Sequence, residues 1–111
     1  MLFRSKAFRR IVDALRERNL SNYATVFASS STVKPGQFEE YDPGAEYYDW
    51  IGYSWWGNEK KFGDAAPALA YARKLKKPVF VAESTARGHY FEKEDSETLW
   101  AGWFTEFFKH I

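Results

Sequence analysis

The chain has 111 residues, enough for one domain with its own core but far short of the ~250 residues of a complete eight-stranded barrel. Its 16 Lys and Arg nearly balance 15 Asp and Glu, and the two signs are interspersed, which argues against a nucleic-acid partner. The lack of cysteine excludes disulfides and thiolate metal sites. No apolar stretch is long enough for a signal-peptide core or a membrane span, so we expect no membrane partner and assign no localisation.

Aromatic residues make up 20% of the chain, including five Trp. Two interpretations compete, namely packing between helix and sheet faces, or a platform on which flat rings meet the C–H faces of sugars. The positions of the rings along the chain must decide between them.

The first half of the chain predicts a helix, a strand and a long loop. Apolar side chains recur at i, i+3, i+4 and i+7 in residues 5–18, which predicts an amphipathic helix. The short apolar run at residues 23–28 predicts a buried strand. Lys-Pro-Gly and Asp-Pro-Gly turn sequences then predict a loop over residues 29–47, with little room for regular structure.

The next segments predict two strands joined by a helix. A strand is expected at residues 50–54 and another at residues 78–82. Between them, the alanine-rich residues 65–75 predict a helix capped by Asp64 and ending in a lysine cluster. Its small side chains suit close packing on a sheet.

The last segment predicts a helix over residues 97–110 with Ser96 as its cap. A broad apolar stripe runs along it, and the helical spacing of its two tryptophans favours burial over sugar binding. The stripe consists of Leu99, Trp100, Trp103, Phe104, Phe107, Phe108 and Ile111.

Apolar strands separated by connections of a dozen or more residues predict a parallel sheet with right-handed crossovers. The predicted fold class is α/β, a partial TIM-barrel-like sheet of three parallel strands with flanking helices in a single domain over residues 1–111. Ligands gather at the carboxyl ends of such strands, where Ser29 to Ser31, Trp55 to Gly57 and Glu83 to Gly88 are expected to converge.

Glu83 is the sharpest chemical feature, because it directly follows a wholly apolar strand. A carboxylate in that place is held rigidly at the mouth of a barrel and fits a catalytic role. The alternative is structural, with Glu83 capping the following loop or pairing with Arg87.

Two stretches, Tyr48 to Trp56 and Lys77 to Gly88, flank an alanine-rich helix and together resemble glycoside hydrolases of the family 26, mannanase type. In that family a sixth strand of Asp-Trp-Val-Gly type is followed by a helix and then a Lys-Pro-Val-like seventh strand ending in the nucleophilic Glu. The resemblance implies that Glu83 occupies the nucleophile's position. The helix from Ala7 to Arg18 and the strand from Tyr23 to Ser29 resemble the family's fourth helix and fifth strand.

Two departures from the family pattern matter. A retaining glycosidase needs two carboxyl groups about 5 Å apart, and the family's acid/base lies at the end of a fourth strand that precedes this chain. The family also places a tyrosine beside the nucleophile, whereas here Trp55 follows Ser54 and Tyr53 is one pleat away. The resemblance therefore implies a retaining glycoside hydrolase lacking its acid/base.

Trp55 and Trp56 are the candidates for a sugar platform, since Gly57-Asn58 predicts a turn that exposes them, although packing over the barrel rim is the alternative. Tyr53 and Arg87 are further substrate-binding candidates. His89 and His110 are too isolated for a metal site, and we expect no cofactor.

Three interpretations follow. The preferred one is a fragment or truncated relative of a retaining glycoside hydrolase acting on β-linked plant polysaccharide. The others are a non-catalytic carbohydrate-binding module and a self-associating structural module. Because three strands leave two edges and one face uncovered, we expect a homo-oligomer, a symmetric dimer that pairs strand edges or exchanges aromatic helices. The expected ligand is a polysaccharide or oligosaccharide.

Overall fold

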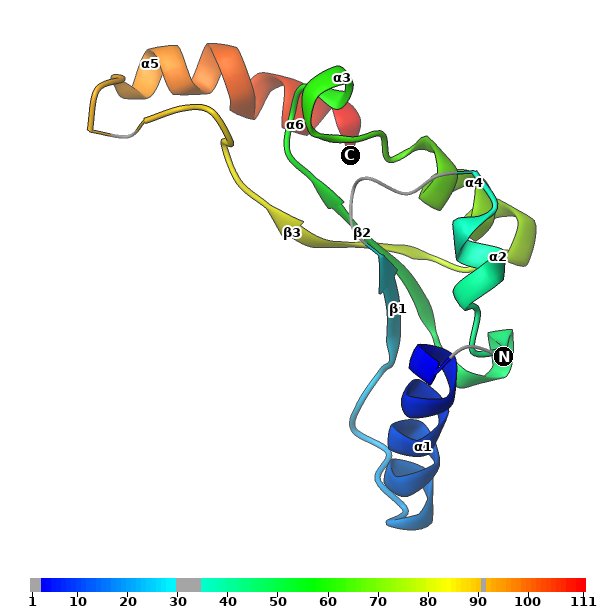
Figure 1. Ribbon diagram of the computed structural model, residues 1–111. Helices are drawn as coiled ribbons and strands as arrows, with labels where there is room; N and C mark the ends of the chain where they lie inside the picture. The colour runs from blue at the N-terminus through cyan, green and yellow to red at the C-terminus, as the bar shows by residue number, and fades with distance from the viewer. Residues whose placement is uncertain (1–2, 30–34, 91) are drawn as a thin grey trace.

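The computed structural model describes residues 3–29, 35–90 and 92–111. It contains a three-stranded sheet in the order β1-β2-β3, formed by β1 (Val26–Ser29), β2 (Trp50–Trp55) and β3 (Val79–Ser84). Both strand pairs are parallel (Figure 1). The α/β class and the parallel sheet of three strands flanked by helices are therefore confirmed.

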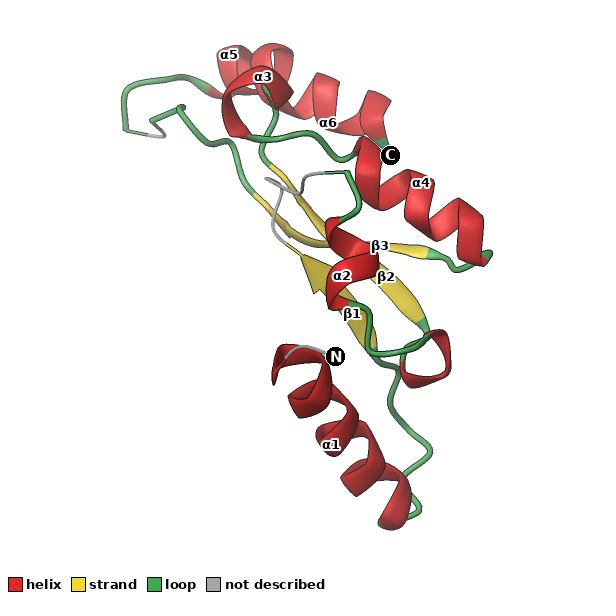
Figure 2. Cartoon of the chain, turned by 45° about the vertical axis from the view of Figure 1, so that its right-hand side comes forward, coloured by secondary structure: helices red, strands yellow, loops and turns green. Residues whose placement is uncertain are grey.

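The N-terminal helix α1 (Phe3–Glu17) lies beyond the edge of the sheet formed by β1 (Figures 1 and 2). Val12 is buried, and Ser5 Oγ donates a hydrogen bond to the carbonyl of Tyr41 at 2.7 Å. Ile11 belongs to the predicted apolar stripe, but 64% of it is exposed. Fewer apolar side chains of α1 are thus buried against the rest of the chain than its sequence pattern predicts.

The segment predicted as a long loop contains two short helices, α2 (Gln37–Tyr41) and η1 (Ala45–Tyr47). The prediction of little regular structure was wrong there, because Phe38 is drawn into the core between Phe27 and Tyr71. The part of the predicted loop at residues 30–34 lies outside the described residues. That part includes Ser30 and Ser31, which were expected at the carboxyl end of the first strand.

Two further helices follow β2. The short α3 (Glu59–Phe62) is capped by Asn58, whose Oδ1 accepts a hydrogen bond from the Lys61 amide at 3.2 Å. Helix α4 (Ala66–Leu75) packs on β2. Asp64 Oδ1 accepts a hydrogen bond at 2.7 Å from the amide of the first residue of α4.

The final helix is divided into three parts, namely α5 (Ser96–Leu99), the π-helical turn η2 (Trp100–Phe104) and α6 (Thr105–His110). The cap is Asp95 instead of the predicted Ser96, because Asp95 Oδ1 accepts the Thr98 amide at 2.7 Å. The extra residue of a π turn shifts the side chains that follow it around the axis. Only Leu99 and Trp103 of the predicted stripe are buried.

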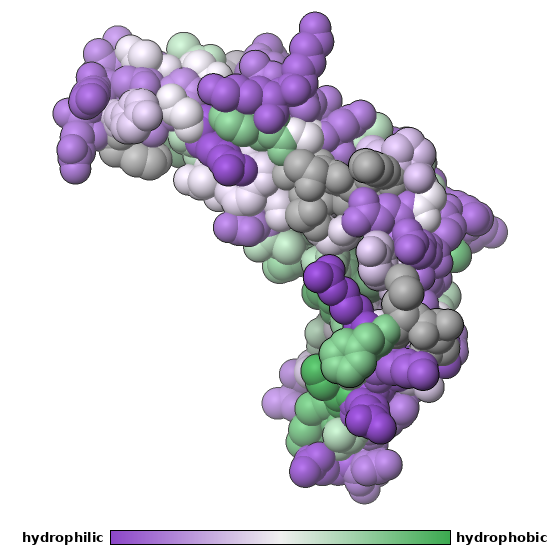
Figure 3. Space-filling view, viewed as in Figure 1, coloured by the Kyte–Doolittle hydropathy of each residue, from purple (hydrophilic) through white to green (hydrophobic). Residues whose placement is uncertain are grey.

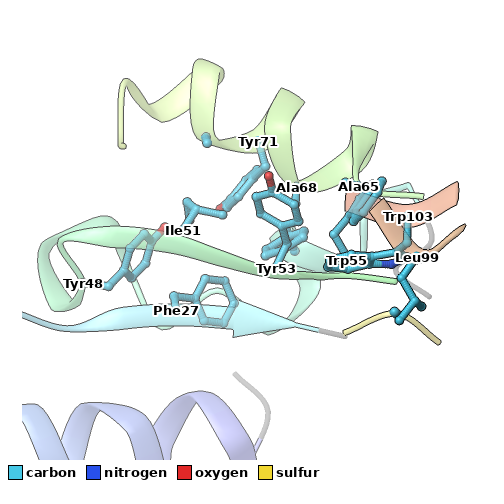
Figure 4. Close-up of a cluster of buried hydrophobic side chains, with 13 residues drawn as sticks. Phe27, Tyr48, Ile51, Tyr53, Trp55, Ala65, Ala68, Tyr71, Leu99 and Trp103 are labelled. Carbon is cyan, nitrogen blue, oxygen red and sulfur yellow. The ribbon is translucent and has the colours of Figure 1, made fainter. Parts of the chain in front are cut away.

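One face of β2 forms the centre of the core (Figure 4). Ile51, Tyr53 and Trp55 alternate along the strand, are at most 5% exposed, and face the side that α4 covers. Ala68 and Ala72 supply small, buried contacts on α4. The aromatic excess is therefore used in part for packing, as the first of the two interpretations expects.

The opposite face of the sheet is much less covered. Strand alternation directs Trp50 and Phe80 away from α4, and these side chains are 37% and 48% exposed. At its centre lies Gly52, where an added Cβ would stand 2.7 Å from side-chain carbons of both Ala28 and Val26. We call this surface the open face of the sheet.

We expect Gly52→Ala to lower the free energy of unfolding by about 1–3 kcal/mol, because a methyl group has no room between β1 and β2. Urea unfolding followed by tryptophan fluorescence measures the change. The matched control is Gly102→Ala, where the nearest atom to the added Cβ is His89 Cε1 at 3.4 Å. Equal losses in the two variants would contradict the steric explanation.

Candidate functional site

Glu83 lies on the open face of the sheet, one residue before the end of β3. Along the β2–β3 ladder Tyr53 pairs with Val81, but Ser54 pairs with Glu83, so Ala82 is an extra residue that forms a bulge. In a regular ladder Ala82 would pair with Ser54, and Glu83 would pair with Trp55 and share its buried face. The bulge thus turns the carboxylate to the exposed side.

The carboxylate of Glu83 lines a hollow of about 660 Å³, which we call the Glu83 hollow. Its remaining walls come from α1, β1, α2 and the bulge. They are Arg4, Ser5, Phe8, Val26, Phe27, Ala28, Ser29, Gln37, Phe38, Tyr41, Ser54 and Ala82. Within the described part of the chain, no second carboxylate lines this hollow, and Glu83 forms no ion pair with Arg87.

Trp55 and Tyr53, two of the predicted substrate-binding residues, point to the opposite face of the sheet. Trp55 stacks on His110 with ring centroids 5.0 Å apart and also contacts Trp103 and Phe107. The Tyr53 hydroxyl lies 2.9 Å from His110 Nε2. Both side chains are at most 5% exposed, so neither offers a ring face to a sugar in this conformation.

Trp56 and Arg87, the other two predicted substrate-binding residues, lie together. The Arg87 guanidinium is 5.5 Å from the centre of the Trp56 ring and 5.2 Å from that of Phe62. Such cation–π contacts hold the loop after β3 against the loop after β2. The sequence predicts that both residues lie at the carboxyl ends of the strands, but only the structure shows that they contact each other.

These two residues line a second hollow of about 740 Å³, which we call the Trp56 hollow. Its lining combines the loop after β2, α3, the loop after β3 and the C-terminal helices. The residues are Trp55, Trp56, Gly57, Asn58, Glu59, Lys60, Phe62, Arg87, His89, Gly102, Trp103, Glu106, Lys109 and His110. The structure therefore separates the predicted site residues, with Glu83 in one hollow and Trp56 and Arg87 in another.

Sequence reasoning missed a pair formed by His89 and Glu94. His89 Nδ1 lies 2.7 Å from Glu94 Oε2, and both side chains are about three-quarters buried. The hydrogen bond from His89 holds the pKa of the Glu94 carboxyl below its usual value. Five residues separate the two in a polar loop, and that spacing carries no recognisable sequence signal.

In residues 3–29, 35–90 and 92–111, no cluster of three or more His, Cys, Asp or Glu side chains could hold a metal ion. The same ranges contain no helix with the length and apolar character needed to cross a bilayer. The chemistry that the described site offers is thus a single exposed carboxylate beside hydroxyl, amide and guanidinium groups.

No known protein-family model matches the chain. It is similar to a beta-1,3-xylanase from Alcaligenes sp, with 24% identity over 125 aligned residues that cover 96% of this chain. It is also 27% identical to the beta-1,3-xylanase TXYA from Vibrio sp, with the same coverage. The chain spans 27% of the length of each relative. These similarities relate it distantly to part of a glycoside hydrolase.

The burial of His110 predicts a pH dependence of stability. Burial lowers the pKa of His110 below its usual 6.5 in the folded chain. Between that lowered value and 6.5 the unfolded state binds more protons, so the free energy of unfolding should rise as pH increases through this window. We expect His110→Phe, which keeps an aromatic ring over Trp55, to flatten this part of the profile.

Urea unfolding at several pH values between 5 and 7.5 measures the effect. Lys109→Gln is the control, because the exposed Lys109 lies one residue away on the same helix. Parallel profiles for the original chain and His110→Phe would contradict the assignment.

Proposed function

We propose that the chain is a fragment or truncated relative of a retaining glycoside hydrolase that acts on β-linked plant polysaccharide, with Glu83 in the position of the nucleophile. The observation that carries the proposal is the placement of Glu83 at the carboxyl end of a parallel strand, exposed in a hollow. In α/β proteins this is where ligands bind and where strand-end residues act on them. The similarity to two β-1,3-xylanases supports the same class of reaction.

The names of these relatives suggest the substrate. Both are β-1,3-xylanases, and the similarity covers almost the whole of this chain. We therefore propose a β-1,3-linked xylan as the polysaccharide. The proposed architecture is the part of a family 26-like barrel that includes the fifth, sixth and seventh strands, assigned to β1, β2 and β3.

The open face of the sheet would be the inner face of that barrel. Side chains at the centre of a barrel come from alternate positions of each strand, and Gly52, Ser54 and Glu83 share one such face. The bulge in β3 supports the assignment, because bulges near the ends of strands re-aim side chains at active sites. In this arrangement a Glu83 oxygen bonds to the anomeric carbon of a sugar bound in the Glu83 hollow while the glycosidic C–O bond breaks. The leaving oxygen takes its proton from the acid/base, which no described residue of this hollow supplies.

A trapping experiment tests the role of Glu83 without needing an acid/base. In a 2,4-dinitrophenyl 2-deoxy-2-fluoro-β-xylobioside the leaving group departs as a stable phenolate and takes the bonding electrons with it, so no proton is required. We expect a Glu83 carboxylate oxygen to bond to the anomeric carbon, with one equivalent of dinitrophenolate released per chain. Mass spectrometry of the digested protein should find the sugar on the peptide that contains Glu83.

The matched control is Glu92→Gln, which removes an exposed carboxylate from the loop after β3 and should leave labelling unchanged. Glu83→Gln should abolish it. Underivatised xylan should be cleaved no faster by the original chain than by Glu83→Ala, because loss of general acid catalysis alone lowers the rate by about 10²- to 10⁴-fold. Labelling at another residue, or none, would refute the proposed role of Glu83.

A self-associating module is the second candidate, favoured by the apolar side chains that the described chain leaves exposed. Trp50 and Phe80 lie on the open face, Trp100 and Phe108 on the C-terminal helices. Figure 3 shows apolar atoms gathered at the end of the molecule where α1 lies. Burying one large apolar side chain contributes ~1.5–3 kcal/mol, so several exposed together favour a partner surface.

Charge favours a second copy of the chain as that partner. Helix α1 carries five basic and two acidic side chains, whereas residues 92–97 carry four acidic and one basic. Figure 1 places these two segments at opposite ends of the molecule. A two-fold arrangement through the open face would set each basic end beside the acidic end of the other copy.

Sedimentation equilibrium at micromolar concentration tests this association. We expect a dimer, and we expect Phe80→Asp to shift it towards the monomer, since the new charge would be buried between the copies. Arg73→Asp, on the exposed side of α4, is the control and should leave the dimer intact. A folded species of monomer mass at all concentrations would exclude the dimer.

A further inference from the structure

The Trp56 hollow is separated from Glu83 by the sheet itself. Among the described residues none lines both hollows, and the central strand presents Ser54 to one and Trp55 to the other. A sugar in contact with Trp56 would therefore occupy a place that the attack by Glu83 does not require. The ligand of the Trp56 hollow must therefore be inferred from the side chains that line this hollow.

Those groups combine a flat apolar ring with planar hydrogen-bond donors. Trp56 is half-buried, and the guanidinium of Arg87 is held over it and over Phe62 by the contacts described above. Arg87 itself is exposed and carries five N–H donors in a fixed plane. A flat ring of the kind that meets the C–H face of a pyranose and a fork of donors for its hydroxyls are thus in contact within one hollow.

His89 adds a second polar group to the wall. Its Nδ1 is engaged by Glu94, which fixes the ring, and Nε2 makes no hydrogen bond with any of the described residues. The π-helical turn η2 forms the facing wall and approaches the His89 ring closely at Gly102, where a Cβ would stand 3.4 Å from His89 Cε1. π turns occur frequently at functional sites.

The loop after β2 contributes Gly57 to the lining of the hollow. Gly57 has φ +97°, a conformation that favours glycine, and a Cβ there would stand 3.2 Å from Trp103. The indole N–H groups of Trp55 and Trp103 are buried and have no hydrogen-bond partner among the described residues. Buried donors without partners are uncommon in native structures and call for a reason such as a functional role.

The charge of the hollow favours a neutral ligand. Three cations, Lys60, Arg87 and Lys109, line it together with two carboxylates. Lys109 is already paired with Glu106 at 2.8 Å. An anion such as a phosphate or a uronate would meet little excess positive charge, whereas uncharged hydroxyls can use both the cationic donors and the carboxylate acceptors.

We propose that the Trp56 hollow is a second carbohydrate-binding site, which holds a short segment of neutral glycan against Trp56 and Arg87, apart from the Glu83 hollow. Its volume of about 740 Å³ is within the range of small-molecule sites. The choice of a β-1,3-xylan as the glycan rests on the proposed function. The site itself rests on the rings, donors and charge of this hollow.

Titration with β-1,3-xylotetraose tests the site, using Glu83→Gln as the starting protein so that no turnover interferes. The chain has five Trp, and their indole N–H signals can be followed separately by nuclear magnetic resonance. We expect the Trp56 signal to shift on binding, while those of Trp50 and Trp100, which do not line this hollow, stay unchanged. A shift confined to Trp50, or no saturable shift at all, would overturn the proposal.

Calorimetry on variants gives an independent measure. In the Glu83→Gln protein, the further substitution Trp56→Ala should weaken the binding of β-1,3-xylotetraose by about tenfold or more. Arg87→Gln should weaken it by a smaller factor. Each substitution removes one of the two groups that recognise the sugar. The matched controls, Trp100→Ala and Arg73→Gln, remove the same residue types outside the hollow and should change the affinity by less than about twofold. Unchanged affinity in both test variants would overturn the proposal.

Circular dichroism checks that each variant is folded. If Trp56→Ala unfolds, Trp56→Phe takes its place, because phenylalanine keeps a flat ring. Full affinity in both Trp56→Phe and Arg87→Gln would then overturn the proposed site. Trapping of a fluorosugar on Glu83 reports on the proposed function separately. Trapping without a Trp56 shift would overturn only the second site, and a Trp56 shift without trapping would overturn only the role of Glu83.

Discussion

Burial of one face of β2 is the interaction on which the other elements depend. Ile51, Tyr53 and Trp55 stand in a row on that face, and they gather α4 and the C-terminal helices over the sheet. Hydrogen bonds to β1 and β3 on both sides fix the direction of this row. The consequence is a molecule with one densely packed side and one open side. The Glu83 hollow lies against β1, α1 and α2, and the Trp56 hollow lies against the loops after β2 and β3 and the C-terminal helices.

The strands and the two longer helices could be predicted from the sequence because their apolar patterns are long and regular. Helix α2 could not, since it has five residues and lies between two glycine turns. Its Phe38 packs against Phe27 and Tyr71, which are distant in sequence, and no local pattern predicts these contacts. The π-helical turn in the last helix was not predicted either. Its Trp103 packs against Trp55 and lies close to Gly57, and both are distant in sequence.

The candidate site likewise combines features that can be read from neighbouring residues with features that depend on residues distant in sequence. A carboxylate at the end of an apolar strand can be found by inspection, and Glu83 lies there in the structure. Which face a strand residue occupies depends on the register with its neighbour, and this separates Glu83 from Trp55 and Tyr53. The meeting of Arg87 with Trp56, and of His89 with Glu94, depends on loop conformations that no periodicity describes.

The bulge at Ala82 decides which face of the sheet carries the carboxylate. With the bulge, Glu83 pairs with Ser54 on the open face. If Ala82 instead paired with Ser54 in a regular ladder, Glu83 would pair with Trp55 and enter the layer beneath α4 and the last helix. A strand without Ala82 would need no bulge, because Glu83 would then follow Val81 directly and pair with Ser54. The extra residue therefore gives this one sequence two registers, of which only the bulged one exposes the carboxylate.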